Sequence, residues 1–442
     1  MSDRDQMPAT GARSPWAWIP TLYFAQGLPY VAVMTLSVVM YKNLGLTNTD
    51  IALYTSWLYL PWVIKPLWSP LVELTGSARG WLVAMQVYIG AGFAAVGLTL
   101  PGDDFVRATL AAFWLLAFAS ATHDIAADGF YMQALSERRQ AAFVGIRSTF
   151  YRCAMIFGQG GLVWLAGWRA QQSGNAADAW AGVFALLAAG FVLAALYHGW
   201  IAPRPKRQSW RDGASGAAAA CAGVDTPAAA MTSFLRVFVA FFARPGIGAM
   251  LAFLLLYRFP EAQLLKLATP FLLDPPTAGG LGLTTQQVGI VYGTVGVAAL
   301  TLGGILGGLV IARTGLRRAL WPLVLCVHLP NLVFVALAFW LPQNLWLIGA
   351  ALAVEQFGYG FGFCAYLLYM IHISQGPHQT AHYAICTGFM AMGMMSPGLW
   401  SGWLQDQLGY LNFFLWIVAA AIPSLWAVSR VDIPADFGRR DA

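Results

Sequence analysis

Long apolar runs divide the chain, and short polar or Gly/Pro-containing breaks separate them. A helix needs about 20 mostly apolar residues to cross the roughly 30 Å hydrocarbon core of a bilayer. Runs of this length predict an all-α membrane protein with twelve transmembrane helices. We place these helices at residues 16–41, 50–72, 80–100, 107–134, 142–168, 179–201, 246–272, 286–311, 320–340, 345–372, 379–404 and 411–430.

Composition indicates that lipid, rather than water, is the solvent of this chain. Of its 442 residues, 59% are hydrophobic and 10% are charged, whereas a soluble domain carries about 25% charged residues. The net charge of +6 does not indicate a nucleic-acid-binding protein, because such proteins gather basic residues on one face of a folded polar surface. We therefore expect the lipid bilayer as a partner, and no nucleic acid.

Basic residues alternate between the predicted loops as the positive-inside rule requires. With the N-terminus inside, the cytoplasmic loops include the Arg pairs at 138–139 and 317–318, whereas the opposite loops hold only Lys42, Arg107 and Arg169. A wrong number of helices would disturb this alternation. The pattern predicts that both termini are cytoplasmic.

A polar segment rich in Ala, Gly and Pro separates the sixth and seventh predicted helices. This composition is typical of a flexible linker. We predict an N-terminal six-helix bundle at 1–201, a cytoplasmic linker at 202–245 and a C-terminal six-helix bundle at 246–442. The linker ends in FLRVFVAFFARPG, which is too short to span a bilayer and predicts an interfacial helix.

The densest polar cluster within an apolar run is ATHDIAADGF in the fourth predicted helix. Asp124 and Asp128 are four residues apart and share a helix face, and His123 precedes the first of them. Two carboxylates so close in a low dielectric repel when both are ionised, which favours a proton on one of them. This pattern predicts a proton-binding site. The alternatives are a hydrated vestibule or structural ion pairs with Arg147 or Arg152.

Further charges interrupt the second and seventh predicted helices. A charge at the centre of a bilayer costs about 2.5–3.5 kcal/mol on insertion scales, so each needs a partner, a cavity or a function. Lys65 lies among prolines that favour a bent, cavity-lining helix, although snorkelling to the interface explains it equally well. Arg258 and Glu261 are three residues apart and could neutralise one another, while Pro260 should bend the seventh helix.

One further acid and two glutamines also lie within the apolar runs. Glu355 has no obvious partner in its own helix, so we predict that it binds a proton or substrate in preference to an ion pair with Arg258 or Lys266. Gln356 adjoins it. In the first helix, AQGLPY places Gln26 beside a helix break, where it suits substrate contact or close helix packing.

Four motifs in order along the chain resemble the AmpG group of major facilitator proteins. They are LYFAQGLPY in the first helix, KPLWSPLVE in the second, SATHDIAADGF in the fourth and SGWLQDQLGY after the eleventh. His123 stands where the pattern of the group has Gln. The resemblance implies a major facilitator fold of two six-helix bundles in the bacterial inner (cytoplasmic) membrane. It also implies a permease that imports muropeptides, the anhydro-muramyl glycopeptides of cell-wall turnover, by proton symport.

The leading hypothesis is therefore a monomeric, proton-coupled importer of a small molecule, with no catalytic residues, cofactor or metal. Asp124, Asp128 and Glu355 would couple protons. The predicted substrate-binding residues are Gln26, Lys65, His123, Arg147, Arg258, Glu261 and Gln356.

Two other hypotheses predict different chemistry. One is import of a ferric siderophore by the same kind of protein. The other is a membrane-embedded transferase that holds a divalent metal on the acids of the fourth helix. A metal-dependent transferase usually needs more acids at short spacing and a sizeable polar loop for its donor, and the linker contains no acidic cluster. Transport is therefore the favoured class.

Overall fold

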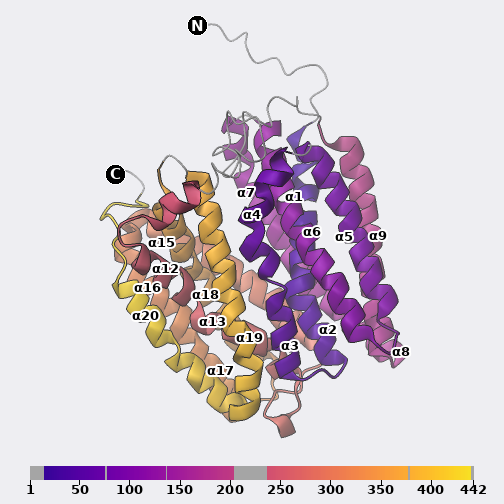
Figure 1. The fold of residues 1–442 in the computed structure, drawn as a ribbon. Helices are drawn as coiled ribbons and strands as arrows, with labels where there is room; N and C mark the ends of the chain where they lie inside the picture. The colour runs from indigo at the N-terminus through magenta and orange to yellow at the C-terminus, as the bar shows by residue number, and fades with distance from the viewer. Residues whose placement is uncertain (1–13, 75–76, 136, 204–235, 377–378, 440–442) are drawn as a thin grey trace.

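The computed structural model describes residues 14–74, 77–135, 137–203, 236–376 and 379–439. All regular secondary structure in these ranges is helical (Figure 1). The predicted all-α class is therefore confirmed. The chain's first and last described segments lie at the same end of the bundle, which is the upper end in Figure 1.

Helices of the first half coincide with predicted spans one to six. They are η1 (Pro15–Ala17), α1 (Ile19–Val31), η2 (Ala32–Leu36), α2 (Ser37–Asn43), α3 (Asn48–Trp57), α4 (Leu60–Leu74), α5 (Ala78–Thr99), α6 (Phe105–Ala134), α7 (Glu137–Ile156), η3 (Phe157–Leu162), α8 (Val163–Ser173) and α9 (Ala176–Ile201). The segments η2 and η3 are single stretches of π-helix within longer helices.

Helices of the second half coincide with predicted spans seven to twelve. They are α12 (Ile247–Leu256), α13 (Phe259–Leu273), η5 (Pro276–Ala278), α14 (Thr285–Val288), η6 (Gly289–Gly296), α15 (Val297–Thr314), α16 (Leu316–His328), η7 (Leu329–Asn331), α17 (Leu332–Trp340), α18 (Leu345–Ser374), α19 (Gln379–Ala419) and α20 (Ala421–Ser429). Like η2 and η3, η6 is a π-helical stretch.

Nine helical segments in the described ranges are long and apolar enough to cross a membrane. The predicted second and fifth spans, which are helical as α3–α4 and α7–α8, are not among these segments. The eleventh and twelfth spans join in one segment, which bends at Gly409, where a φ of 72° favours glycine. The membrane class is thus confirmed, while the number of twelve crossings stays a prediction.

The linker prediction falls largely outside the described residues, which resume at 236. Residues 236–242 are helical, at the position predicted for an interfacial helix. Beyond this helix, Arg244 donates hydrogen bonds to the backbone carbonyls of Ile373 and Gln375. The start of the second half is therefore attached to the end of α18.

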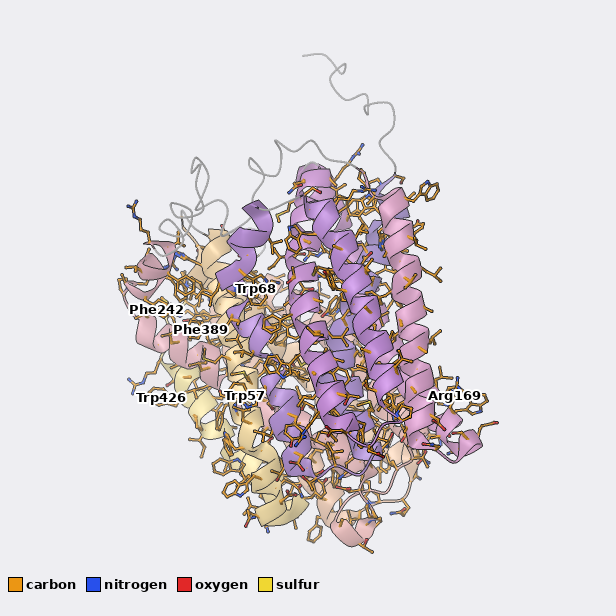
Figure 2. All side chains as sticks on the ribbon, turned by 45° about the vertical axis from the view of Figure 1, so that its right-hand side comes forward. Trp57, Trp68, Arg169, Phe242, Phe389 and Trp426 are labelled. Atoms are coloured by element: carbon orange, nitrogen blue, oxygen red, sulfur yellow. The ribbon has the colours of Figure 1, made fainter. Side chains whose placement is uncertain are left out.

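Each half has its own aromatic core. In the first half, Phe93 and Phe113 both pack against Phe184, and in the second half Phe271 packs edge-on against Phe414. Large apolar side chains also cover the outside of the bundle, including the exposed rings of Trp57, Phe242 and Trp426 (Figure 2). An apolar exterior of this kind fits contact with lipid better than contact with water.

The two halves are joined at the lower end of Figure 1 by a polar network. Lys42 Nζ at the end of α2 lies 2.7 Å from Asp274 Oδ1 at the end of α13. Asn48 at the start of α3 donates to Gln405 Oε1 (2.6 Å) and to the Tyr410 hydroxyl (2.9 Å) on α19. Because these groups are shared between the halves, the network closes this end of the bundle. We call Lys42, Asn48, Asp274, Gln405 and Tyr410 the end seal.

Glycines allow the halves and their helices to approach closely. A Cβ on Gly293 in η6 would meet the backbone carbonyl of Gln159 in η3, so the two π-helical stretches cross in direct backbone contact. Within the second half, a Cβ on Gly303 or Gly307 of α15 would meet the α18 backbone, whereas one on Gly308 would meet nothing within 4 Å. Of these three glycines, Gly303 and Gly307 therefore serve helix packing, and Gly308 does not.

Replacing Gly307 by Ala should lower the thermal stability of the purified protein. The added methyl group overlaps the backbone of Phe361, and overpacking of this kind costs about 1–3 kcal/mol. Gly308→Ala, one residue further along α15, is the matched control and should melt like the wild type. Equal melting temperatures for the two variants in detergent would contradict the packing described for α15 and α18.

Removing the Asp274 carboxylate should open the end seal. Asp274→Ala removes the acceptor of the Tyr410 hydroxyl and the ion-pair partner of Lys42, which keeps only its hydrogen bond to Asn48 among the described residues. This loss should weaken the closed arrangement by about 1–3 kcal/mol. Spin labels at the exposed positions Gln172 and Gln343 should then report a population at longer distance in electron paramagnetic resonance measurements. Asp104→Ala removes an exposed acid at the start of α6 that pairs with Arg107, and it should leave the distance distribution unchanged.

Candidate functional site

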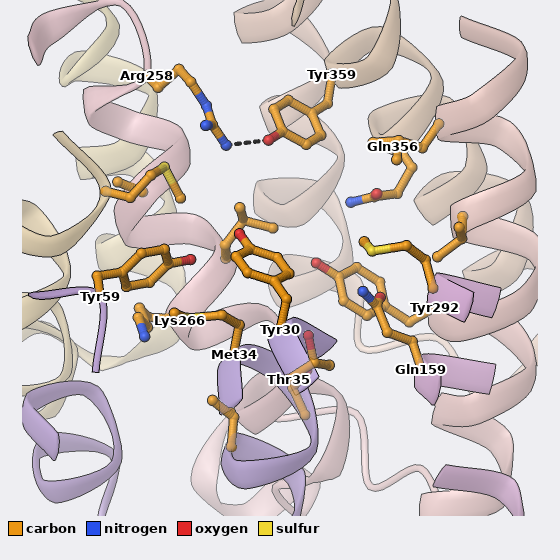
Figure 3. A pocket seen from close by; sticks show the side chains of 18 residues that line it. Tyr30, Met34, Thr35, Tyr59, Gln159, Arg258, Lys266, Tyr292, Gln356 and Tyr359 are labelled. Atoms are coloured by element: carbon orange, nitrogen blue, oxygen red, sulfur yellow. Dashed lines mark hydrogen bonds between the residues drawn. The ribbon is translucent and has the colours of Figure 1, made fainter. Parts of the chain in front are cut away.

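A cavity lies between the two halves, at the level where their helices are interrupted (Figure 3). The elements that line it are α1, η2, η3, α13, η6 and α18, among others. Its polar lining residues are Tyr30, Thr35, Tyr59, Gln159, Arg258, Lys266, Thr269, Tyr292, Gln356 and Tyr359. Both halves therefore contribute polar groups to one internal site.

Broken helices shape this cavity. The seventh predicted span divides into α12 and α13 at Tyr257 and Arg258, directly before Pro260. Proline has no backbone N–H and cannot continue the hydrogen-bond ladder of the preceding helix, so the bend predicted at Pro260 is confirmed. The free N–H groups at the start of α13 carry a partial positive charge that attracts anions.

Two buried cations face the cavity from α13. Arg258 donates to the Tyr359 hydroxyl and lies over the Tyr359 and Phe363 rings. Lys266 donates to Thr55 Oγ1 at 2.9 Å and lies 5.1 Å from the centre of the Tyr59 ring. Neither forms an ion pair with a carboxylate in the described ranges. The cavity is thus lined by two positive charges that no protein anion neutralises directly.

Two buried carboxyl groups adjoin this region. Glu261 in the first turn of α13 is 0% exposed, and Glu355 in the middle of α18 is 1% exposed. They interact electrostatically with each other. Gln356 Nε2 donates to Glu355 Oε2 at 2.9 Å. The predicted neutralisation of Arg258 by Glu261 does not take the form of an ion pair, and Glu355 pairs with neither Arg258 nor Lys266.

Asp124 lies in a separate cluster in the first half. Its carboxylate accepts from Gln26 Nε2 (3.0 Å) and Trp62 Nε1 (3.2 Å), and Lys65 Nζ lies 3.7 Å away. Lys65, which could have snorkelled to the interface, instead pairs with an acid of another helix. Sequence reasoning selected Gln26, Lys65 and Asp124 separately, and the structure brings these three together.

Asp128 has a cation of its own. Arg147 Nη2 of α7 lies 2.9 Å from Asp128 Oδ1, and the guanidinium lies over the rings of Tyr23 and Tyr131. The structural ion pair considered as an alternative for Asp128 is therefore present. Asp124 and Asp128 are each compensated by a different cation, which weakens the electrostatic reason for a proton held between them.

His123 lies away from the cavity, inside the first half. Gln86 Nε2 donates to His123 Nε2 at 3.1 Å, and Gln86 Oε1 lies 3.1 Å from His198 Nδ1. Thr21 Oγ1 continues this chain to His198 Nε2 at 3.0 Å. The chain joins α1, α5, α6 and α9, so its visible effect is to hold these helices together. A role of His123 in substrate binding stays a prediction.

Sequence reasoning therefore found part of the cavity and missed its aromatic part. Of the predicted residues, Arg258 and Gln356 line the cavity, and Glu261 and Glu355 adjoin it. Lys266 was considered only as a possible ion-pair partner of Glu355. The residues that were missed are Tyr30, Tyr59, Gln159, Tyr292 and Tyr359. Their position in the sequence could have identified them, because most of these residues stand beside a proline, a glycine or a helix interruption.

The donor set favours binding of an organic anion over metal chemistry. Guanidinium, ammonium, amide and phenol groups hold carboxylates and hydroxyl-rich molecules. No group of three or more His, Cys, Asp or Glu side chains in the described part of the chain could hold a metal ion. The acids of the fourth predicted helix are engaged with Lys65 and Arg147.

Comparisons with known proteins agree with this geometry. A family model of the Major Facilitator Superfamily matches residues 21–395. The chain is 27% identical to an anhydromuropeptide permease of Escherichia coli K12, over 91% of this chain and 77% of that protein. It is 23% identical to a putative transporter, AmpG 4, of Rickettsia conorii, over 92% of this chain and 93% of that protein.

Solved structures with the same fold are transporters. A bacterial homologue of the human lysosomal transporter Spinster, in an inward-facing and unoccupied conformation, aligns with a TM-score of 0.66 and 15% identity, over 96% of this chain and 97% of that chain. A nucleoside transporter aligns with a TM-score of 0.63 and 15% identity, over 94% and 99% of the two chains. These similarities concern the fold.

Replacing Lys266 by Met should keep or raise the thermal stability of the protein. The substitution removes a buried charge that costs several kcal/mol and loses one hydrogen bond worth about 1 kcal/mol. Arg244→Met is the matched comparison, because Arg244 ties the start of the second half to α18 and its loss should lower the melting temperature. A fall for Lys266→Met as large as that for Arg244→Met would contradict an uncompensated charge at Lys266.

Proposed function

Because the chain belongs to the Major Facilitator Superfamily and is a multi-pass membrane transporter rather than an enzyme, we propose that it imports anhydromuropeptides into the cytoplasm with protons. The similarity to the anhydromuropeptide permease of Escherichia coli, over 91% of this chain, supports this cargo. In this proposal the protein acts as a monomer in the bacterial inner membrane, with both termini in the cytoplasm.

The observation that carries the proposal is the pair of uncompensated cations in the cavity. Arg258 and Lys266 are eight residues apart on α13, which corresponds to about 12 Å along a helix. A substrate that engages both needs two anionic groups at such a separation. The peptide part of a muropeptide offers several carboxylates, whereas a neutral sugar or nucleoside offers none. Charge-assisted hydrogen bonds to these carboxylates would replace water at both cations.

The remaining lining suits the sugar part of the same molecule. Tyr30, Tyr59 and Tyr292 contribute aromatic rings to the lining. Such rings can pack against the apolar faces of sugars, and their hydroxyls can bond sugar oxygens. Gln159 and Gln356 offer both donors and acceptors. Pockets that bind small molecules commonly combine such aromatic walls with a few placed polar groups.

Proton coupling is the second part of the proposal. Asp124, Asp128 and Glu355 are the candidate proton carriers, and Gln26, Lys65, His123, Arg147 and Glu261 are candidate partners of the substrate or of these acids. In the described conformation Asp124 and Asp128 lie beside Lys65 and Arg147. If an acid separates from its cation during transport, its carboxylate would bind a proton, and it would release the proton when the ion pair forms again.

Uptake of labelled anhydromuropeptide into proteoliposomes with an imposed proton gradient tests the proposal. Arg258→Gln should reduce uptake at subsaturating concentration by at least about tenfold, because a hydrogen bond to a charged group contributes about 1.5–3 kcal/mol. Arg107→Gln changes an exposed arginine outside the cavity and should transport like the wild type.

Absence of muropeptide uptake by the wild-type protein, with uptake of a ferric siderophore in the same vesicles, would show that the cargo is wrong. Equal loss of uptake in Arg258→Gln and Arg107→Gln would instead contradict the role of the cavity cation.

A further inference from the structure

We propose that Glu261 and Glu355 together bind one exchangeable proton, and that this proton controls whether Arg258 and Gln356 are free to bind the substrate anion. This inference rests on the proposed function and names the coupling site within it. In the expectation drawn from the sequence, Asp124, Asp128 and Glu355 couple protons, and Glu261 binds substrate and could neutralise Arg258. The new element is that Glu261 and Glu355 act as one pair.

The two carboxyl groups are buried without the partners that buried charges require. Both side-chain oxygens of Glu261 and Oε1 of Glu355 have no hydrogen-bond partner in the described part of the protein. Neither group forms an ion pair there. Ionising one buried carboxyl group costs several kcal/mol, and ionising its neighbour as well adds repulsion. A pair that keeps one proton avoids the second cost.

The surroundings of the pair explain why the fully protonated pair can release one of its two protons while keeping the other. The groups that interact with it electrostatically are Arg258 at the start of α13, Tyr292 on η6 and Tyr359 on α18. Arg258 and the helix start at α13 favour a negative charge on Glu261. Among the described residues, Arg258 is the cation that acts on Glu261, and it stabilises one negative charge. We therefore infer exchange between a singly ionised and a neutral state of the pair.

Arg258 links the pair to the anion site. When the pair is ionised, Arg258 is attracted to Glu261 and its charge is partly neutralised. When the pair is protonated, the full charge of Arg258 is available to a substrate carboxylate in the cavity. Proton binding and anion binding therefore strengthen one another, and this coupling is reciprocal by thermodynamic linkage. If the protein changes conformation with both bound, the proton and the anion cross the membrane together, which is symport.

Gln356 provides a second link. Its Nε2 donates to Glu355 Oε2, and the side chain reaches the cavity beside Tyr359 and Tyr292 (Figure 3). An ionised carboxylate only accepts hydrogen bonds, whereas a protonated one also donates. A protonated Glu355 would thus either donate to the Gln356 amide oxygen after the amide turns over, or lose its hydrogen bond to Gln356. Either change alters the donors and acceptors that Gln356 offers to the substrate.

Comparison of two transport modes tests this site in the full-length protein. We would measure accumulation driven by a proton gradient, and exchange of labelled for unlabelled anhydromuropeptide without a gradient. In Glu261→Gln and Glu355→Gln, accumulation should fall at least about tenfold more than exchange, as expected for loss of a typical coupling free energy. The pH dependence of substrate affinity should also flatten. Asp104→Asn, on the exposed surface, is the control.

A second measurement does not depend on the cargo. Infrared spectra of the ligand-free protein should contain the carbonyl stretch of a buried protonated carboxyl group. This band should lose intensity in Glu261→Gln and in Glu355→Gln and remain unchanged in Asp104→Asn. An unchanged band in both Gln variants would overturn the proposal, whatever the substrate is.

Transport data separate the remaining outcomes. Wild-type accumulation in both Gln variants, with accumulation lost in Asp124→Asn or Asp128→Asn, would overturn the proposal in favour of the first-half acids. Failure of the wild-type protein to exchange anhydromuropeptide, together with the expected infrared change, would refute the cargo and support the proton site.

Discussion

The structure depends on one constraint, which is that backbone N–H and C=O groups cannot be left unpaired in hydrocarbon. Helices satisfy this constraint along most of the chain that faces lipid. The interruptions η2, η3, η6 and the break before α13 all occur where the two halves meet, and each contributes residues to the cavity. Backbone groups released there can be satisfied by neighbouring helices, water or substrate. The position of the cavity therefore follows from where the helices are allowed to break.

Much of the fold could be predicted from the sequence because each helix pairs its own backbone groups. Apolar runs of membrane-spanning length depend on each helix alone, so all twelve predicted spans coincide with helical segments, although the number of crossings stays a prediction. Pro260 also acts locally, and its bend was predictable. The π-helical stretches depend on close packing between helices, as at Gly293 against Gln159. A single sequence does not state which glycine faces which helix.

The candidate site likewise has a part that the sequence predicts and a part that only the assembled structure shows. Charges inside an apolar run are visible in the sequence, which is why Asp124, Arg258 and Glu355 were selected. Their partners lie on other helices, so the pairing of Lys65 with Asp124 and of Arg147 with Asp128 could not be assigned. The cavity tyrosines were missed for another reason. Tyrosine is common in membrane proteins at the interface and in packed cores, and only the assembled halves show which rings line the cavity.

Charged side chains within the helices are arranged differently in the two halves, and this difference bears on mechanism. In the first half, acids and bases are paired across helices, which holds α4, α6 and α7 in a defined arrangement. In the second half, Arg258 and Glu261 are only three residues apart, yet they form no ion pair, and Lys266 bonds a neutral hydroxyl. A protein selected for stability alone would pair or remove such charges. In the function proposed above, a substrate anion supplies the counter-charge to Arg258 and Lys266, and a proton neutralises the carboxyl pair.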